Sequence, residues 1–265
     1  MSAGNVEGLR LAREGMVAWL TIDRPPRNAF THAMYEELAR ICASFGGEVD
    51  ENAPRVLVIT GAGGKAFAAG TDIAQFREFT TREAVLAYEA RVEAALDALE
   101  RCPIPTIAAI AGACTGGGAA IAACCDLRLA SAGSRFGFPI ARTLGNTLSI
   151  RNYQRLANLV GPARVKEMIF TARLLGAEEA QHAGLLMEVL DDADALHARA
   201  RALAEEIAGN APLTLRAAKE ALNRIRPELR REVGEDLLLG CYLSEDFQEG
   251  VEAFLAKRKP NWRGK

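Results

Sequence analysis

The sequence predicts an α/β protein that ends in a helical module. The first half of the chain alternates short β-like apolar runs with amphipathic helical patterns, whereas the patterns beyond Ser149 are almost wholly helical. From about Asn210 onward no convincing strand occurs. We therefore expect an α/β core over residues 1–209 and a helical C-terminal module over residues 210–265.

Composition and charge are those of an ordinary globular protein. The chain has 265 residues, of which 49% are hydrophobic and 25% are charged, and its formal net charge is −2. This balance argues against nucleic acid or an anionic membrane as a partner. No apolar run reaches the roughly 18–20 residues that cross a bilayer. The polar N-terminus lacks the apolar segment of a signal peptide, so we expect a cytoplasmic protein.

Cysteines and histidines indicate neither a disulfide framework nor a metal centre. The three histidines are too few for a His-rich metal site. Six cysteines without a C-x-x-C pair are expected to be reduced thiols. They are Cys42, Cys102, Cys114, Cys124, Cys125 and Cys241.

The first third of the chain predicts two strands and two helices. Val17–Ile22 is a strand pattern, and a helix follows from about Thr31 with apolar residues at helical spacing. Val56–Thr60 has the composition of a buried strand. Thr80 and Glu83 form a capping-box pattern that predicts the start of the second helix.

The middle of the chain predicts two further strands around a short helix. Pro103 and Pro105 precede the strand Thr106–Ala111, and a triple glycine leads to the small-residue helix Ala119–Cys124. The strand Asp126–Ala130 follows. Further on, Gly161-Pro162 is expected to separate two helices.

Two motifs suggest rival functions. Gly61–Ala66 follows a strand and resembles a dinucleotide fingerprint, but no long helix pattern follows to bind a pyrophosphate. Gly112–Gly116 has the form of a nucleophile elbow with Cys114 in place of serine, which would make the protein a thiol hydrolase. Its base would be His182 or His197, and both lie in helical patterns rather than on loops after strands.

The glycines fit a third function better. Two glycine-containing segments, Ala69–Asp72 and Thr115–Gly118, allow a ligand to approach the main chain closely. N–H groups from two segments can converge on one oxygen and stabilise negative charge that develops there, as on a thioester carbonyl. The positive end of the short helix after Gly117 would add to this effect.

Together the two segments resemble the enoyl-CoA hydratase/isomerase family, also called the crotonase superfamily. The similarity keeps the order and spacing of the family's motifs over nearly the whole chain. The matching stretches are Asp23-Arg-Pro with Asn28-Ala-Phe, Lys65–Ile73, Ile110-Ala-Gly112 with Gly116-Gly-Gly, Cys125-Asp126, Phe136-Gly with Pro139, and Phe254–Lys259.

The resemblance implies a fold and an assembly. We expect a crotonase-like spiral of ββα units with a C-terminal helical trimerisation module, and a homotrimer or a dimer of trimers. An acyl-CoA thioester is the implied partner. CoA enters as part of the substrate, so no separate cofactor is expected.

The resemblance also implies roles for individual residues. The oxyanion hole falls on the N–H groups of Thr71 and Gly117. Phe254 and Lys257 fall where the tail of a neighbouring subunit commonly meets the nucleotide end of CoA. The CoA arm and the acyl pocket are assigned to Arg27, Ala29, Lys65, Ala69, Asp72, Ile73, Ala120 and Ile140. For Asp72, capping or tying the oxyanion loop is the favoured interpretation.

The sequence departs from the family where the reaction is decided. Hydratases carry two glutamates that hold a water and move its proton, and those positions are Ala120 and Ile140 here. No Asp or Glu occurs from Leu127 to Lys166. Asn146 and Thr147 can position water but cannot act as a base near neutral pH. Carboxylates that could reach the pocket are Asp72 and those of the helix after Thr80, namely Glu83, Glu89 and Glu93.

Three functions therefore remain open. The first is an acyl-CoA hydratase or isomerase of fatty acid metabolism whose base lies elsewhere in the chain. The second is another reaction of the superfamily on acyl-CoA, such as hydrolysis, dehalogenation or decarboxylation. The third is a non-catalytic protein that binds acyl-CoA.

Overall fold

The computed structural model describes residues 6–46, 53–225 and 233–265. The strands in these ranges are β1 (Leu9–Glu14), β2 (Val17–Ile22), β3 (Val56–Gly61), β4 (Ala66–Ala69), β5 (Thr106–Ile110), β6 (Ala113–Thr115), β7 (Leu127–Ser131), β8 (Arg135–Gly137), β9 (Leu175–Gly176) and β10 (Glu188–Leu190). The helices are α1 (His32–Ser44), α2 (Arg82–Glu100), α3 (Gly117–Cys124), α4 (Ile140–Thr143), α5 (Ile150–Thr171), α6 (Ala177–His182), α7 (Ala193–Ala208), α8 (Pro212–Arg224), α9 (Glu235–Tyr242) and α10 (Glu245–Leu255), with the 3-10 helix η1 (Ile73–Glu78).

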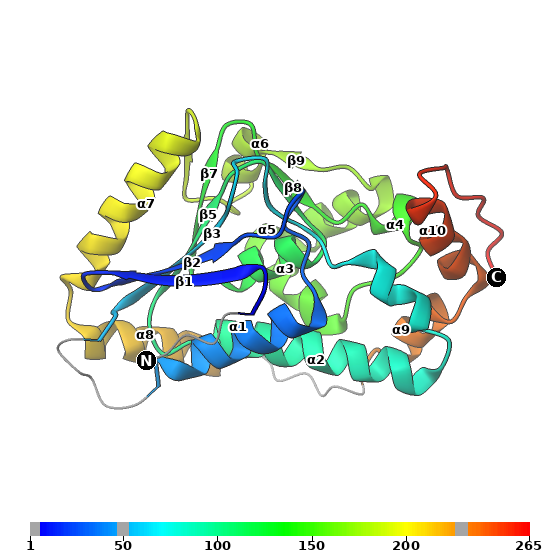
Figure 1. Ribbon diagram of the computed structural model, residues 1–265, viewed down its shortest axis with the longest axis horizontal. Helices are drawn as coiled ribbons and strands as arrows, with labels where there is room; N and C mark the ends of the chain where they lie inside the picture. Colours follow the sequence, from blue (N-terminus) through cyan, green and yellow to red (C-terminus); the bar gives the residue numbers. More distant parts are fainter. Residues whose placement is uncertain (1–5, 47–52, 226–232) are drawn as a thin grey trace.

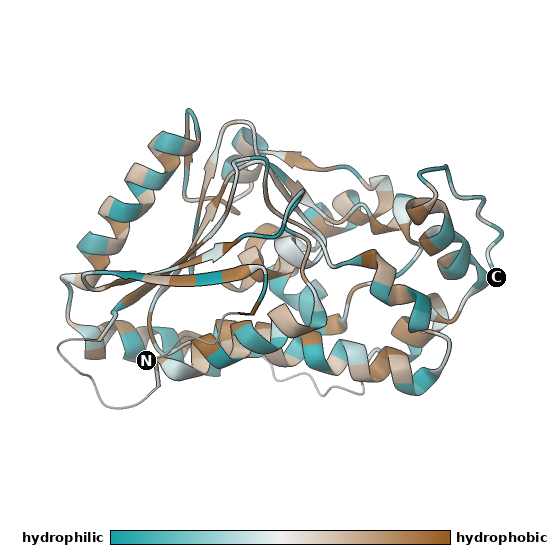
Figure 2. Cartoon of the chain, in the orientation of Figure 1, coloured by the Kyte–Doolittle hydropathy of each residue, from teal (hydrophilic) through white to brown (hydrophobic). Residues whose placement is uncertain are grey.

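The larger sheet has the strand order β1-β2-β3-β5-β7-β10. β1 pairs with β2 in antiparallel fashion, and the other pairs are parallel. Successive side chains of the central strands point to opposite faces of this sheet, and each face packs into its own apolar cluster. Because both faces are buried, these strands are continuous apolar runs in the sequence. Leu57 and Ile59 face the main core, whereas Val56 and Val58 face the side covered by α7 (Figure 1). Figure 2 shows the central strands as predominantly hydrophobic, while the outer helices mix both colours.

The smaller sheet has the order β4-β6-β8-β9. Each of β3, β5 and β7 is followed by a short strand of this sheet, and then by a helix, which is a repeated ββα unit. Gly112 makes the sharp turn between β5 and β6 with a φ of 71°. A Cβ at this position would lie 2.5 Å from the carbonyl carbon of Lys65, so only glycine fits. The structure thus has the expected crotonase-like spiral.

The short helix α3 starts directly against β4. A Cβ at Gly118 would lie 2.7 Å from the Cβ of Ala68, so the absence of a side chain lets the helix approach the strand. Its remaining residues, Ala119 to Cys124, are all buried. α3 therefore lies inside the molecule, between the smaller sheet and helix α2.

The C-terminal helices pack against the α/β core of the same chain. Lys219 of α8 forms an ion pair of 2.7 Å with Asp126, just before β7. α10 packs against η1, where Gln248 donates to the carbonyl of Phe79. Aromatic rings of η1, of the residue that follows it, and of α9 and α10 form one cluster, namely Phe76, Phe79, Tyr242 and Phe247. In Figure 1, α9 and α10 lie at the end of the long axis away from α7, whereas α8 lies at the same end as α7.

Most long elements match the sequence prediction. The strand Val17–Ile22 is confirmed, those predicted near residues 56 and 106 end within one residue of the expected position, and that predicted from Asp126 is shifted by one residue. The prediction of two helices around Gly161-Pro162 is also confirmed, because Gly161 has a φ of 77° inside α5. None of the helices in the described ranges is long and apolar enough to cross a membrane.

Two features of the elements differ from the prediction. α2 is capped by Thr81, whose side chain accepts from the N–H of Ala84, so the capping pattern at Thr80 was assigned one residue too early. The short strands β1, β4, β6, β8, β9 and β10 were not predicted, and β9 and β10 lie in the part of the chain that was expected to be almost wholly helical. They have two to six residues, and β4 consists mainly of Ala, which has little β-propensity.

Candidate active site

A cavity of about 400 Å³ lies where the smaller sheet meets α2, α4 and the C-terminal helices. Ten of the twelve residues that the sequence analysis assigned to a site line this cavity. They are Arg27, Ala29, Ala69, Thr71, Asp72, Ile73, Gly117, Ala120, Ile140 and Phe254. Lys65 and Lys257 are exposed and do not line it. Phe254 borders the cavity of its own chain, although the resemblance suggested a role in a neighbouring subunit.

The two glycine segments contact each other at one wall of the cavity. A Cβ at Gly116 would lie 3.3 Å from the Cα of Gly70, and both glycines have positive φ angles, of 53° and 100°. A Cβ at Gly117 would lie 2.9 Å from Oγ1 of Thr71 and would overlap the hydroxyl of Tyr35. The absence of side chains is therefore what allows the segments to meet.

The N–H groups of Thr71 and Gly117 are not used by the secondary structure around them. Phe30 and Thr71 form a parallel bridge in which the N–H of Phe30 donates to Gly70 and the N–H of Asp72 donates to Phe30. In this geometry the N–H of Thr71 points away from Phe30. Gly117 is the first residue of α3, so its N–H has no acceptor within the helix. Two donors from touching segments are thus available to a ligand.

Two phenols hold Thr71 in place. Tyr35 of α1 and Tyr88 of α2 contact Oγ1 of Thr71 at 2.8 Å and 3.3 Å. Burial raises the pKa of both phenols above the ordinary value, so they remain neutral hydroxyls. The main chain at Thr71 is therefore positioned before any ligand arrives.

The wall beside these donors is apolar. Ala120 and Ile140, which the resemblance assigns to the positions of the hydratase glutamates, are only 5% and 6% exposed. Phe138 is also buried there. An acyl chain fits such a wall, whereas a water held for addition finds no carboxylate at these positions.

Asp72 has a structural role. Its Oδ2 accepts from Arg24 at 2.7 Å, and its Oδ1 accepts from the N–H of Ala74 at the start of η1. The carboxylate thus caps η1 and ties the segment after Thr71 to the chain before α1. This agrees with the interpretation favoured from the sequence.

Glu89 of α2 lines the cavity and has no cationic partner among the described residues. Its Oε1 accepts from the hydroxyl of Tyr242, on α9, at 2.9 Å. Tyr242 in turn accepts from Nδ2 of Asn146 at 3.1 Å, while Oδ1 of Asn146 is buried without a partner. Burial raises the pKa of Glu89 to about 7, and the nearby Glu93 adds to the rise.

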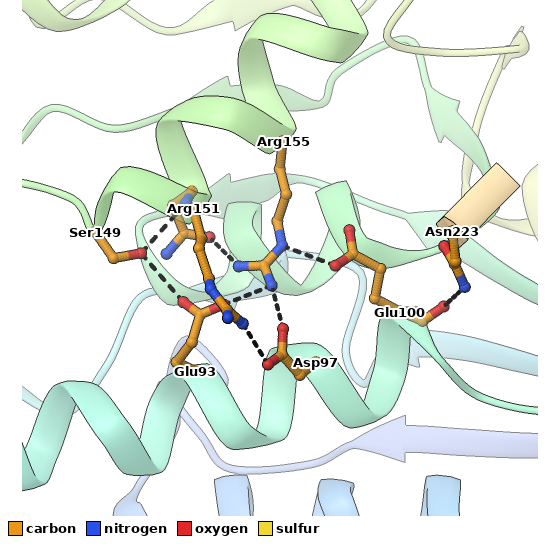
Figure 3. Close-up of polar contacts among 8 residues, drawn as sticks. Glu93, Asp97, Glu100, Ser149, Arg151, Arg155 and Asn223 are labelled. Atoms are coloured by element: carbon orange, nitrogen blue, oxygen red, sulfur yellow. Dashed lines mark hydrogen bonds and ion pairs between the residues drawn. The ribbon is translucent and has the colours of Figure 1, made fainter. Parts of the chain in front are cut away.

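Glu93, one turn further along α2, is in the opposite situation. Figure 3 shows it within a cluster that joins α2 to α5. Its Oε1 lies 2.6 Å from Arg155, and its Oε2 accepts from the hydroxyl of Ser149. Arg155 also pairs with Asp97 and Glu100 at 2.9 Å and 3.2 Å. The charge of Glu93 is therefore balanced by the ion pair with Arg155. Glu83 is exposed and lies outside the cavity.

The thiol-hydrolase alternative does not agree with the structure. Cys114 lies in β6 and is fully buried, and burial raises the pKa of its thiol well above the ordinary value. His182 binds the carbonyl of Glu178 in α6, and His197 stacks on Trp19 on the far face of the larger sheet. Neither ring contacts the thiol, so no nucleophile and base pair forms.

The dinucleotide alternative also fails. Gly61–Ala66 leads into the short strand β4 and not into a helix that could bind a pyrophosphate. No group of three or more His, Cys, Asp and Glu residues in the described ranges is arranged to hold a metal ion.

Two tyrosines around the cavity were not among the predicted site residues. Tyr35 follows Met34 in an ordinary helix pattern, and Tyr242 is 153 positions from the glutamate that it contacts. Neither carries a local signal, because their roles depend on how α1 and α9 pack against α2.

Comparisons with known proteins match the whole architecture. A family model described as enoyl-CoA hydratase/isomerase matches residues 12–265. A short-chain-enoyl-CoA hydratase from Clostridium acetobutylicum is 36% identical over 258 residues, which cover 94% of this chain and 95% of the relative. A crotonyl-CoA hydratase from Syntrophomonas wolfei is 34% identical and covers 98% of this chain and 99% of its own.

Solved structures with names from the same family are similar to this chain over nearly its whole length. An enoyl-CoA hydratase/carnithine racemase from Magnetospirillum magneticum has a TM-score of 0.78 and 35% identity, over 98% of this chain and 97% of the other. A methylmalonyl-CoA decarboxylase in complex with 2-nitronate-propionyl-CoA has a TM-score of 0.86 and 25% identity, over 98% and 100% of the two chains.

Proposed function

Since the chain belongs to the enoyl-CoA hydratase/isomerase family, also called the crotonase superfamily, we propose that it stabilises the enolate of an acyl-CoA thioester between two main-chain donors. The thioester oxygen accepts from the N–H groups of Thr71 and Gly117. The acyl chain extends along the apolar wall of Ala120 and Ile140.

A single observation carries this proposal. Two N–H groups that the secondary structure leaves free belong to touching segments at the wall of the cavity. Donors fixed in this way stabilise charge that develops during the reaction, and losing one typically costs roughly 2.7–4 kcal/mol. The start of α3 adds the positive end of its helix dipole.

The CoA arm is assigned to the cavity mouth. Arg27, Ala29 and Ala69 line it, with Phe254 on the opposite helix α10. The exposed ammonium groups of Lys65 and Lys257 are proposed to meet the phosphates outside the cavity, where point charges suffice. CoA is part of the substrate, and we propose no other cofactor.

Hydration is not favoured as the reaction. Addition of water needs groups that deliver a hydroxyl and a proton, and both usual positions are apolar. A proton transfer at the carbon next to the thioester needs only one base and the oxyanion hole. We therefore propose isomerase-type proton transfer as the main activity.

Decarboxylation is the second candidate. Loss of CO₂ from a 2-carboxyacyl-CoA leaves the same enolate without any base. The similarity to a methylmalonyl-CoA decarboxylase at a TM-score of 0.86 favours it, together with the absence of both glutamates.

One assay separates these reactions. Saturated, 2-enoyl, 3-enoyl and 2-carboxyacyl-CoA esters are incubated with the protein in D₂O and analysed by mass spectrometry. We expect deuterium next to the thioester and conversion of 3-enoyl to 2-enoyl esters. Release of CO₂ alone would support the second candidate. Binding of the esters with no exchange and no product would refute the enolate proposal and leave a binding protein.

A further inference from the structure

The cavity holds only two carboxylates among the described residues, Asp72 and Glu89. Asp72 is paired with Arg24 and caps η1. Glu89 accepts one hydrogen bond from Tyr242, and no donor in the described ranges reaches its Oε2. Glu89 is thus the one carboxylate of the cavity with an oxygen left for a substrate.

The polar groups around Glu89 leave room for a ligand atom. Asn146 donates to Tyr242, and its buried Oδ1 has no partner although it lines the same cavity. A buried acceptor without a partner costs free energy unless water or a ligand donates to it. The two oxygens, Oε2 of Glu89 and Oδ1 of Asn146, are therefore suited to a site that is filled during function.

Glu89 also borders a second cavity of about 210 Å³, which it shares with Ser149. The charged groups at this second cavity are already paired. Glu93 and Arg151 lie 3.8 Å apart, and Glu235 binds Arg82 at 2.8 Å. No free cation in the described ranges fixes the charge of Glu89 from that side.

Glu89 is electrostatically linked to the oxyanion residue. Burial raises the pKa of Tyr35, and the charge of Glu89 adds to that rise, so the carboxyl acts on the phenol that contacts Thr71. Tyr88, the neighbour of Glu89 on α2, donates to the same Thr71 hydroxyl. Glu89, Thr71 and Gly117 also line the same cavity, so the carboxyl and the two main-chain donors belong to one site.

On the basis of the proposed function, we propose that Glu89 replaces the missing glutamates as the proton carrier of this enzyme. Oε2 takes a proton from the carbon next to the thioester carbonyl, and the C–H electrons form the enolate whose oxygen is held by Thr71 and Gly117. The carboxyl then returns the proton, either to the same carbon or two carbons further along a 3-enoyl chain. In the second case the carbonyl re-forms and the double bond moves from carbons 3–4 to carbons 2–3.

The electrostatics suit this role. The pKa of about 7 for Glu89 has burial as its first cause and Glu93 as a further one, while the hydrogen bond from Tyr242 lowers it. A carboxyl in this range is present in both protonation states near neutral pH, as a group that accepts and returns a proton requires. Tyr242 and Asn146 are positioning residues, because they contact the carboxyl or its partner.

The test compares Glu89→Gln with the matched control Glu83→Gln on the same helix, whose side chain is exposed and outside both cavities. Butyryl-CoA in D₂O reports exchange, 3-hexenoyl-CoA reports isomerisation, and calorimetry reports binding. We expect Glu89→Gln to lower both rates about 10²–10⁴-fold, the usual contribution of general acid–base catalysis. Binding of butyryl-CoA should change less than threefold, and Glu83→Gln should match the wild type.

A second variant tests the positioning role. Tyr242→Phe removes the hydrogen bond that lowers the pKa of Glu89, so the inflection of the rate against pH should move upward from about 7. A purely structural role would leave this inflection in place. If the wild type exchanges protons and Glu89→Gln does so at the same rate, the Glu89 assignment is wrong. If the wild type neither binds nor exchanges these esters, the proposed function itself is wrong.

Discussion

Thr71 and Gly117 are positioned by contacts that leave almost no free space. Tyr35 occupies the place that a side chain at position 117 would take, and it also bonds Thr71. Oxyanion donors act because they are fixed before the reaction begins. The hydroxyl of Tyr35 thus excludes a side chain at position 117 and also holds Thr71, whose N–H is one of the two proposed donors.

Substitutions at position 117 separate the effect of an added side chain from the effect of a lost N–H group. Gly117→Ala keeps the N–H but adds a Cβ that overlaps the Tyr35 hydroxyl, and Gly117→Pro removes the N–H as well. We expect each to lower proton exchange about 10²–10³-fold. In the Tyr35→Phe background the Ala variant should regain part of its rate and the Pro variant should not. Equal recovery of both would show that the N–H of Gly117 is not a donor to the substrate.

The control for these variants is Gly133→Ala, because Gly133 has open space around its Cβ position. Its exchange rate and urea midpoint should match the wild type.

Glu89 also makes stability depend on pH. Its pKa is raised from 4.5 to about 7 in the folded protein, so between these values the unfolded chain releases the proton first. The free energy of unfolding should therefore fall as pH rises from about 4.5 to 7, and the loss is complete above pH 7. We expect Glu89→Gln to be more stable than the wild type at pH 8, by roughly 3 kcal/mol, because the pKa is about 2.5 higher in the folded protein and each pKa unit corresponds to about 1.4 kcal/mol.

Urea unfolding at pH 8 and pH 4.5 measures this difference. The two proteins should have similar stability at the lower pH. A difference of equal size at both pH values would mean that Gln acts through packing and not through charge.

At the scale of elements, the cluster in Figure 3 fixes α2 against α5. Arg155 is only 6% exposed and bonds three carboxylates of α2. Breaking a buried ion pair from one side leaves an uncompensated charge, which typically costs about 3–5 kcal/mol. Because Glu89 lies on the same helix, this cluster also determines where the proposed proton carrier lies.

Arg155→Met tests the cluster. We expect a loss of about 3–5 kcal/mol in the free energy of unfolding at pH 7, measured by urea unfolding. The control Arg199→Gln breaks the half-exposed pair with Glu188 and should cost about 1 kcal/mol or less. Equal losses in the two variants would show that the cluster contributes no more to the free energy of unfolding than a surface ion pair does.

Elements could be predicted from the sequence where the chain itself determines them. β2 and β3 are buried on both faces, so their continuous apolar runs identify them. β4 and β6 have four and three residues, and their strand conformation comes from pairing with each other. Short pairings of this kind depend on distant segments and leave no period in the sequence.

The same distinction applies to the site. The glycine segments were predictable because only glycine permits the close approach at Gly117 and readily adopts the φ of 100° at Gly70. Glu89 was one of several candidate carboxylates, and the choice depends on the rotation of α2 and on Tyr242 from α9. Sequence spacing does not encode either of these.

On the scale of the whole molecule, α8 has no buried residue in the single chain. Leu213, Leu222 and Ile225 are more than 60% exposed, as is Phe170 of α5. We propose that these exposed apolar side chains contact another subunit. Their exposure supports the proposal that the protein forms a homotrimer or a dimer of trimers through its C-terminal module.

Leu222→Glu tests this assembly, because a carboxylate there would be buried without a partner. Mass photometry should find trimers or hexamers for the wild type and smaller species for the variant at the same concentration. An unchanged mass would exclude α8 from the interface, and a monomeric wild type would refute the assembly.

The cavity is closed by helix α10 of the chain that carries it, with Phe254 and Leu255 in its wall. In the proposed oligomer, the proposed oxyanion donors, the proposed proton carrier and this cavity wall would therefore all come from one subunit. Subunits in an oligomer should then work independently of their neighbours. When inactive Glu89→Gln subunits are mixed with wild-type ones, the total rate should decline in direct proportion to the fraction replaced, and saturation with substrate should be hyperbolic.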